Sequence, residues 1–141
     1  MAERWAEFLN ETPALEFLLD AVAKYGAPVL DLACGAGRLL LPLARAGVDL
    51  DGSDFSQDML DQCRRLADKL DLEVDLYPSP MDALALPRTY RTIYIIGSFE
   101  LAGSRKADLD TLKRCHEHLQ AVGALILNLQ AEYNSPEAWK M

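Results

Sequence analysis

Basic residues, paired cysteines and long apolar runs are all scarce in this sequence of 141 residues. The 14 Lys and Arg are outnumbered by 22 Asp and Glu, so the net charge is −8 and no basic stripe could neutralise nucleic-acid phosphates. The same charge disfavours an acidic membrane surface, and no apolar run approaches the length of a membrane span. We therefore expect neither nucleic acid nor membrane among the partners of this chain.

Cysteine is represented only by Cys34, Cys63 and Cys115, an odd number without any Cys-x-x-Cys spacing. This pattern argues against a disulfide framework and against a zinc site, and it favours a reducing compartment. The amino terminus also lacks the layout of a signal peptide. We expect no bound metal and a cytoplasmic location.

Half of the residues are apolar and 26% are charged, which is typical of one globular domain spanning residues 1–141. Within it we expect three parts: a helical leader at 1–26, a core at 27–130 and a polar tail at 131–141. Apolar runs alternate with helically spaced segments along the core, which predicts an α/β fold with a doubly wound, mostly parallel sheet. The expected strands are 28–32, 48–53, 72–77, 93–98 and 123–129, and the expected helices are 38–46, 56–70 and 109–119. On the last helix, His116 is expected to pack half-buried and His118 to point elsewhere.

The first strand of the core leads into a loop of small residues. Strand, glycine loop and helix in succession form a nucleotide-type cradle at the carboxyl end of a strand. Gly35 and Gly37 allow a ligand to lie against the main chain without meeting a Cβ atom. Their alternative is an ordinary turn.

Two common ligands do not suit this loop. The third glycine of a Gly-x-Gly-x-x-Gly dinucleotide motif is missing, and Gly37 is followed by Arg38-Leu39 where a phosphate loop needs Lys and then Ser or Thr. Asp31 beside the loop would repel a pyrophosphate but suits a cation. S-adenosylmethionine has no phosphate and carries a sulfonium and an ammonium group, so it fits. Asp31 could also be a helix cap or a solvated strand end.

At these residues the chain resembles the class I S-adenosylmethionine-dependent methyltransferases, in the group of small-molecule enzymes, from about Pro28 to Leu129. The first family motif, acid-x-small-x-Gly-x-Gly, corresponds to Asp31, Ala33, Gly35 and Gly37, with Ala33 where glycine is more usual. The resemblance implies a Rossmann-like sheet of order 3-2-1-4-5. It also implies S-adenosylmethionine as cofactor, S-adenosylhomocysteine as product and a small-molecule acceptor.

The resemblance further implies roles for residues that follow the next strands. Asp54, 19 residues beyond Gly35, would take both ribose hydroxyls, a role that needs a carboxylate. Asp82 would lie near the adenine amino group. The rest of the implied cofactor-binding set is Phe55, Met59, Ala83 and Ser98. Two alternatives stay open: Asp54 is one of several surface acids, and Asp82 belongs to a simple turn.

No catalytic residue is required, because positioning can supply most of the rate of transfer of an activated methyl group. Glu100 is the candidate base if the acceptor needs deprotonation, although a solvent carboxylate is the simpler interpretation. Two other functions remain open: a cofactor-binding or assembly module without catalysis, and a nicotinamide-dependent oxidoreductase, which the missing glycine disfavours.

Members of the family ordinarily continue with two further strands, whereas this sequence ends after the fifth. We expect it to be part of a longer enzyme, the alternative being a naturally reduced domain. In both cases the fifth strand is an apolar edge that can pair with another chain. We expect a homodimer or an exchanged assembly through that edge.

Overall fold

The computed structural model describes residues 13–99 and 103–128. They form the predicted α/β fold: a five-stranded sheet in the order β3-β2-β1-β4-β5, with every neighbouring pair parallel. The strands are β1 (Val29–Leu32), β2 (Leu50–Asp54), β3 (Asp75–Pro78), β4 (Tyr90–Ile95) and β5 (Leu119–Leu127). The helices are α2 (Pro13–Tyr25), α3 (Leu40–Arg45), α4 (Gln57–Lys69), α5 (Arg105–His118) and the short 3-10 helix η1 (Met81–Ala83). The first 12 residues of the expected leader, Glu100 and the expected tail lie outside the described residues.

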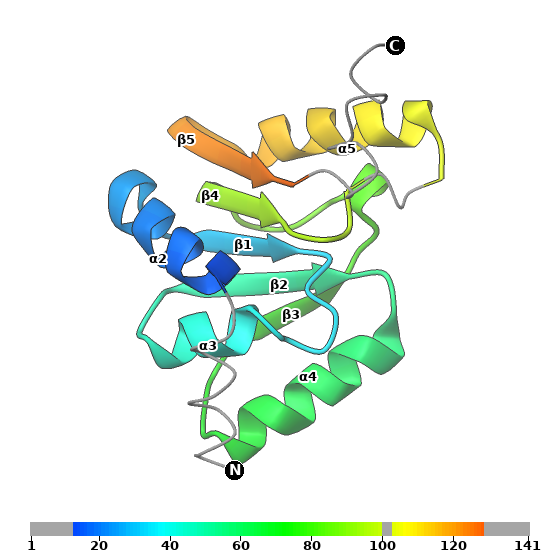
Figure 1. Cartoon of the computed structure of the whole chain (residues 1–141). Helices are drawn as coiled ribbons and strands as arrows, with labels where there is room; N and C mark the ends of the chain where they lie inside the picture. The colour runs from blue at the N-terminus through cyan, green and yellow to red at the C-terminus, as the bar shows by residue number, and fades with distance from the viewer. Residues whose placement is uncertain (1–12, 100–102, 129–141) are drawn as a thin grey trace.

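The sheet is covered on both faces, which gives a three-layer arrangement (Figure 1). On one face α2, α3 and α4 enclose an apolar cluster that includes Leu18, Leu40 and Val29. On the other face the cluster includes Leu30 and Leu32 of β1 together with Cys115 of α5. Because β1 is buried on both sides, its sequence is a uniform apolar run interrupted only by an acid.

Helix α3 begins at Leu40 rather than at the predicted Arg38, and turns occupy the preceding residues. The later start places Pro42 in the first helical turn, where its missing N–H leaves no helical hydrogen bond unmade. The turn that leads from the loop into α3 is closed by a hydrogen bond of 3.0 Å from the Leu41 N–H to the Gly37 carbonyl. The segment between β1 and α3 is therefore a longer loop than the sequence predicts.

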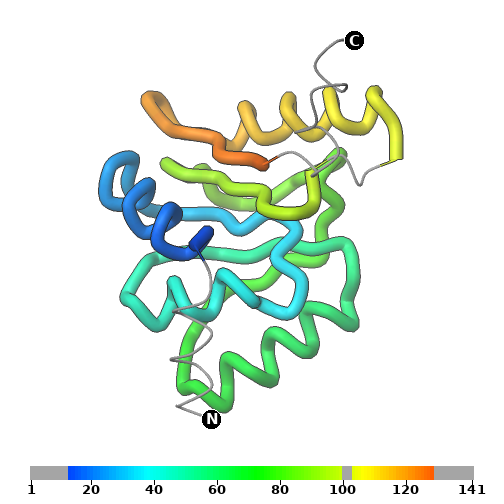
Figure 2. Tube along the Cα trace, in the orientation of Figure 1, coloured from blue at the N-terminus to red at the C-terminus, as the bar shows by residue number. Residues whose placement is uncertain are grey.

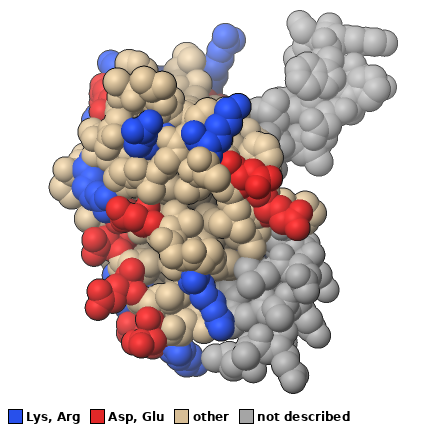
Figure 3. All heavy atoms as spheres, turned by 90° about the vertical axis from the view of Figure 1, so that its left-hand side faces the viewer, with Lys and Arg blue, Asp and Glu red and all other residues tan. Residues whose placement is uncertain are grey.

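Strand β4 begins at Tyr90, earlier than the predicted Ile93. Tyr90 is fully buried, and its hydroxyl donates to Asp51 Oδ2 over 2.7 Å. Arg88 Nη1 also donates to Asp51 Oδ1 at 3.2 Å. The Arg88 guanidinium lies over the Tyr90 ring, with Cζ 5.7 Å from the ring centroid. The sequence did not predict this early start, because the residues around it are polar and their hydrogen-bond partner, Asp51, lies on β2. Figure 3 looks onto this amino-terminal side of the sheet, where charged residues of both signs are interspersed among uncharged ones.

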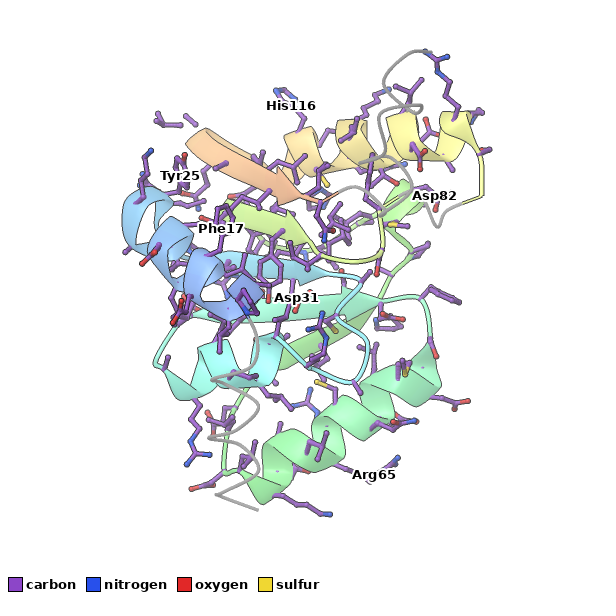
Figure 4. All side chains as sticks on the ribbon, viewed as in Figure 1. Phe17, Tyr25, Asp31, Arg65, Asp82 and His116 are labelled. Carbon is purple, nitrogen blue, oxygen red and sulfur yellow. The ribbon has the colours of Figure 1, made fainter. Side chains whose placement is uncertain are left out.

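The expectation for the two histidines of α5 is wrong. His116 is exposed and points away from the sheet (Figure 4), whereas His118 is buried, with a relative exposure of 8%. His118 Nε2 accepts the Leu86 N–H at 3.1 Å, so Nδ1 carries the proton and donates to the Arg114 carbonyl at 2.7 Å. The inward face of α5 consists of Ala107, Thr111, Cys115 and His118. Both ring nitrogens of His118 are thus engaged in structural hydrogen bonds.

Boundaries of the other elements differ from the predictions by a few residues. Ser56 caps α4 as predicted, since its Oγ accepts the Met59 N–H at 3.3 Å. β3 lies at one edge of the sheet, as its alternating sequence predicts.

Among the described residues, no helix has both the length and the apolar character needed to cross a membrane.

Strand β5 begins at Leu119 rather than at the predicted Gly123, and an irregularity interrupts its pairing with β4 between Tyr90 and Thr92. Val122 lies in this irregularity with a φ of +64° and a relative exposure of 87%. A β-branched residue in the left-handed region is strained. Gly123 follows it in a crowded position, since a Cβ there would lie 2.9 Å from the Gln120 carbonyl oxygen.

We predict that Val122→Gly raises the free energy of unfolding by roughly 1 kcal/mol, because relief of about 1–2 kcal/mol of left-handed strain exceeds the entropic cost of glycine. Urea denaturation measures the change. Gly123→Ala is the matched control and should be destabilising, since the added methyl group meets the backbone. An unchanged or lower stability of Val122→Gly would contradict the strain at this position.

Candidate cofactor-binding site

A cleft of about 260 Å³ opens at the carboxyl ends of β1 and β2. Figure 2 shows the β1–α3 segment turning back at the same edge at which β2 passes into α4. The cleft is lined by Ala33, Asp54, Phe55, Ser79, Pro80, Met81, Asp82 and Ser98. Five of these residues belong to the set predicted from the sequence: Ala33, Asp54, Phe55, Asp82 and Ser98. They lie at or after the carboxyl ends of four different strands, so the fold has brought distant parts of the chain to one place.

The carboxylate of Asp54 ties this edge of the sheet together. Its Oδ2 accepts the Gly35 N–H at 2.9 Å, and its Oδ1 accepts the Ser56 N–H at 2.9 Å. Asp54 is 7% exposed, so it lies in the wall of the cleft and not among surface acids. A carboxylate has about four acceptor positions, and two backbone donors leave the others available to a ligand.

Asp31 lies deeper than the cleft wall. It is 4% exposed and hydrogen-bonded to its cross-strand neighbour Tyr94, whose hydroxyl donates to Asp31 Oδ2 over 2.6 Å. Burial raises the pKa of Asp31 to about 7, although the Tyr94 hydrogen bond and the charge of Arg38 oppose the rise and Asp54 adds to it. Figure 4 shows Asp31 among the strands at the centre of the molecule. The alternatives of a helix cap or a solvated strand end are therefore wrong.

The two glycines of the loop have different surroundings. Gly35 and Gly37 have φ angles of +57° and +96°, which only glycine adopts freely. A Cβ on Gly37 would lie 2.8 Å from Cys63 Sγ and 2.8 Å from Leu41 Cγ, so close packing of the loop on α3 and α4 requires glycine there. A Cβ on Gly35 would meet only Met59 Cε, at an ordinary 3.6 Å. The predicted open approach for a ligand therefore holds at Gly35 and not at Gly37.

Ala33, Met59 and Ala83 complete the predicted set. Ala33 has a φ of +66°, which explains why glycine suits its position in the family motif better. Met59 lies on the first turn of α4 and is 40% exposed. Phe55 precedes α4 and is 80% exposed at the rim of the cleft. Ala83 follows Asp82 in η1 and does not line the cleft.

Sequence reasoning missed Ser79, Pro80 and Met81, which line the cleft beside Asp82. Ser79 is 7% exposed, and its Oγ accepts the Ala85 N–H at 3.3 Å, so it holds the connection after β3 in place. The clustered prolines of this connection were the available signal. Asp82 itself lies beyond the carboxyl ends of the strands (Figure 4).

The sequence matches the protein family described as "Methyltransferase domain" over residues 29–123, more than half of the chain. A curated ubiquinone biosynthesis O-methyltransferase from Bartonella tribocorum is 32% identical over 81 residues, which are 55% of this chain and 33% of that protein. The chain spans only 24% to 39% of the length of the curated relatives that it matches. The matched range contains the loop, β2 and the cleft.

Solved structures share the fold. An S-adenosylmethionine-dependent methyltransferase from Clostridium acetobutylicum has a TM-score of 0.77 at 19% identity, over 94% of this chain and 59% of that one. The glycopeptide N-methyltransferase MtfA complexed with S-adenosylmethionine has a TM-score of 0.74 at 21% identity, over 86% of this chain and 56% of its own. At these identities the likeness establishes the predicted Rossmann-like methyltransferase fold, and this chain spans little more than half of each structure.

The buried carboxyl of Asp31 predicts an unusual dependence of stability on pH. Its pKa is about 7 in the folded chain and near 3.8 when unfolded, so the folded state binds more protons between these values. The free energy of unfolding should therefore fall as the pH rises from about 4 to about 7, by up to about 4 kcal/mol.

Asp31→Asn should flatten this fall, because the amide does not ionise. Urea denaturation across the pH range measures it, with Asp20→Asn on the exposed face of α2 as the control that keeps the wild-type profile. If the fall persists unchanged in Asp31→Asn, another group causes it.

Proposed function

Because the chain belongs to the methyltransferase-domain family of class I S-adenosylmethionine-dependent enzymes, we propose that it binds S-adenosylmethionine in this cleft and methylates a small-molecule acceptor. The observation that carries the proposal is the charge of the cleft. Its described lining holds two carboxylates, Asp54 and Asp82, and neither Lys nor Arg. Such a lining favours a sugar-bearing cation and disfavours a diphosphate.

Each part of the cofactor has a complementary residue in this proposal. The unshared acceptor positions of Asp54 receive the ribose hydroxyls, and Asp82 receives the adenine amino group. Phe55 and Met59 present apolar surface to the adenine ring, while Ala33 and Ser98 border the path toward the sulfur. Asp31 contributes negative charge below the loop, which attracts the sulfonium and ammonium groups.

The bound cofactor supplies an activated methyl group, so the protein has to hold the acceptor in line with it. The ubiquinone biosynthesis enzyme is named an O-methyltransferase, and the structurally similar glycopeptide enzyme is named an N-methyltransferase. We propose an acceptor with a hydroxyl or an amine on this basis. Glu100, the expected candidate base, lies outside the described residues.

A second candidate is a module that binds the cofactor without methylating anything. The observation that favours it is the lining of the cleft, where no described residue has an assigned role toward the acceptor. Binding and turnover therefore have to be measured separately.

We predict by calorimetry that the chain binds S-adenosylmethionine and S-adenosylhomocysteine but not NAD. Asp54→Ala should weaken binding about 100-fold or more, because two hydrogen bonds to a charged group are lost. Asp58→Ala, on the exposed start of α4, is the control and should bind normally. Asp54→Asn retains an acceptor for one backbone N–H and shows whether loss of folding explains the result.

Binding of NAD in place of the two sulfur nucleosides would overturn the proposal. Release of S-adenosylhomocysteine over a panel of phenols and amines tests turnover. Intact binding with no release on any acceptor would favour the module without catalysis.

The assembly and location of the chain complete the proposal. β5 is an edge strand with residues such as Leu125 and Ile126 only half-buried, and exposed strand edges pair with other chains. We propose a homodimer or exchanged assembly through this edge. The three cysteines are free and buried, which suits a cytoplasmic location.

Light scattering should give twice the mass of the chain at micromolar and higher concentrations. On dilution into monomers, amide hydrogen exchange should speed up along β5 and stay unchanged along β3, the opposite edge strand. A clean monomer at high concentration would rule out this assembly.

A further inference from the structure

A buried hydrogen bond lies immediately before the cofactor loop, between Tyr94 of β4 and Asp31 of β1. The two residues are cross-strand neighbours, with relative exposures of 0% and 4%. The Oη to Oδ2 distance of 2.6 Å is typical of a hydroxyl that donates to a carboxylate. Such a bond favours the ionised form of the acid, so Tyr94 opposes the effect of burial on Asp31.

The other groups around Asp31 act in both directions. The groups that face it are Tyr94 from β4, Asp54 from β2, Arg38 and Cys34 from the β1–α3 segment, and Cys63 from α4. Arg38 attracts the charged form of Asp31, whereas Asp54 and burial disfavour it. The pKa of the Cys34 thiol is raised by its hydrogen bond with Cys63 and by burial, so this thiol is uncharged. The result is an acid whose charge state is balanced near neutral pH, two residues before the loop.

The chain contains a second buried pair with the same chemistry at the other end of β4. The Tyr90 hydroxyl donates to Asp51 Oδ2 over 2.7 Å, and Tyr90 is as fully buried as Tyr94. Tyr90 packs in the cluster on the opposite face of the sheet from Tyr94. Tyr90 and Asp51 lie near the amino-terminal ends of β4 and β2, away from the cofactor loop, so this pair is a natural control.

We propose that Tyr94 is a positioning residue for the cofactor. The Tyr94 hydroxyl favours the ionised, cation-attracting state of the Asp31 carboxylate over the protonated state. The inference rests on the proposed function. A cation that enters the site favours ionised Asp31, so its binding expels the proton of any protonated Asp31 and affinity rises with pH through neutrality. The charge acts through the buried interior without direct contact with the ligand.

The test compares Tyr94→Phe, Tyr90→Phe and the wild type by calorimetry, at pH values from about 6 to about 9. The ligands are S-adenosylmethionine and 5′-methylthioadenosine, a neutral nucleoside that keeps the adenine and the ribose. The ratio of wild-type to variant affinity is taken at each pH, because titration of the ligand's own amino group cancels in that ratio.

Loss of the Tyr94 hydrogen bond should raise the pKa of Asp31, by about one unit for a bond of this kind. Tyr94→Phe then binds S-adenosylmethionine about fivefold more weakly at about pH 7 and almost normally at about pH 9. The neutral nucleoside should bind this variant like the wild type at every pH. Tyr90→Phe should leave both affinity profiles unchanged.

A second measurement uses the wild type alone, in case Tyr94→Phe does not fold. Calorimetry in buffers of different ionisation enthalpy counts the protons released on binding. At about pH 6.5, binding of S-adenosylmethionine should release most of one proton and binding of 5′-methylthioadenosine should release none. Asp31→Asn should abolish the release.

The outcomes separate the two levels of the account. An affinity ratio for Tyr94→Phe that does not change with pH, an equal loss for the neutral nucleoside, or binding without proton release would overturn the role of Tyr94 alone. Failure of the wild type to bind either nucleoside would overturn the proposed function and this inference with it.

Discussion

The hydrogen bond from the Gly35 N–H to Asp54 Oδ2 is the interaction on which the candidate site depends. It joins the loop after β1 to the end of β2 across a parallel strand pair, so the loop cannot move without releasing a nearly buried carboxylate. The same carboxylate accepts the Ser56 N–H and thereby fixes the start of α4. One side chain thus sets the positions of the loop, the strand end and the helix that together form the wall of the cleft.

Charge then determines what this wall can hold. Asp54 faces the cleft and Asp31 lies buried next to the loop, and the charge of Asp54 adds to the cost of ionising Asp31. A diphosphate would add further negative charge, whereas a sulfonium with an ammonium group relieves the repulsion. The strand, loop and helix of a nucleotide-binding site are thereby retained, but the site favours a cationic ligand where other nucleotide sites favour an anionic phosphate. Burial of Asp31 reduces stability near neutral pH, which is a common feature of functional sites.

The sequence predicts what local patterns control and misses what distant partners control. The alternation of apolar runs and helically spaced segments predicts the doubly wound sheet, and the family resemblance supplies the strand order and the role of the acid at the end of β2. The contact of Cys63 with Gly37, which adds to the crowding by nearby Leu41, was not predictable, because Cys63 lies 26 residues further along the chain. The burial of His118 depends on the Leu86 N–H, and the early start of β4 depends on Asp51 bonding to Tyr90. In each case a hydrogen bond or contact between separate elements overrides the periodicity of the segment.

The account is tested most directly by a crystal structure of the chain grown with S-adenosylhomocysteine. It predicts density for the nucleoside in the cleft, with both ribose hydroxyls within hydrogen-bonding distance of Asp54 and the adenine beside Asp82. A ligand bound elsewhere, or a loop closed over the cleft by its own side chains, would contradict the assignment of this site.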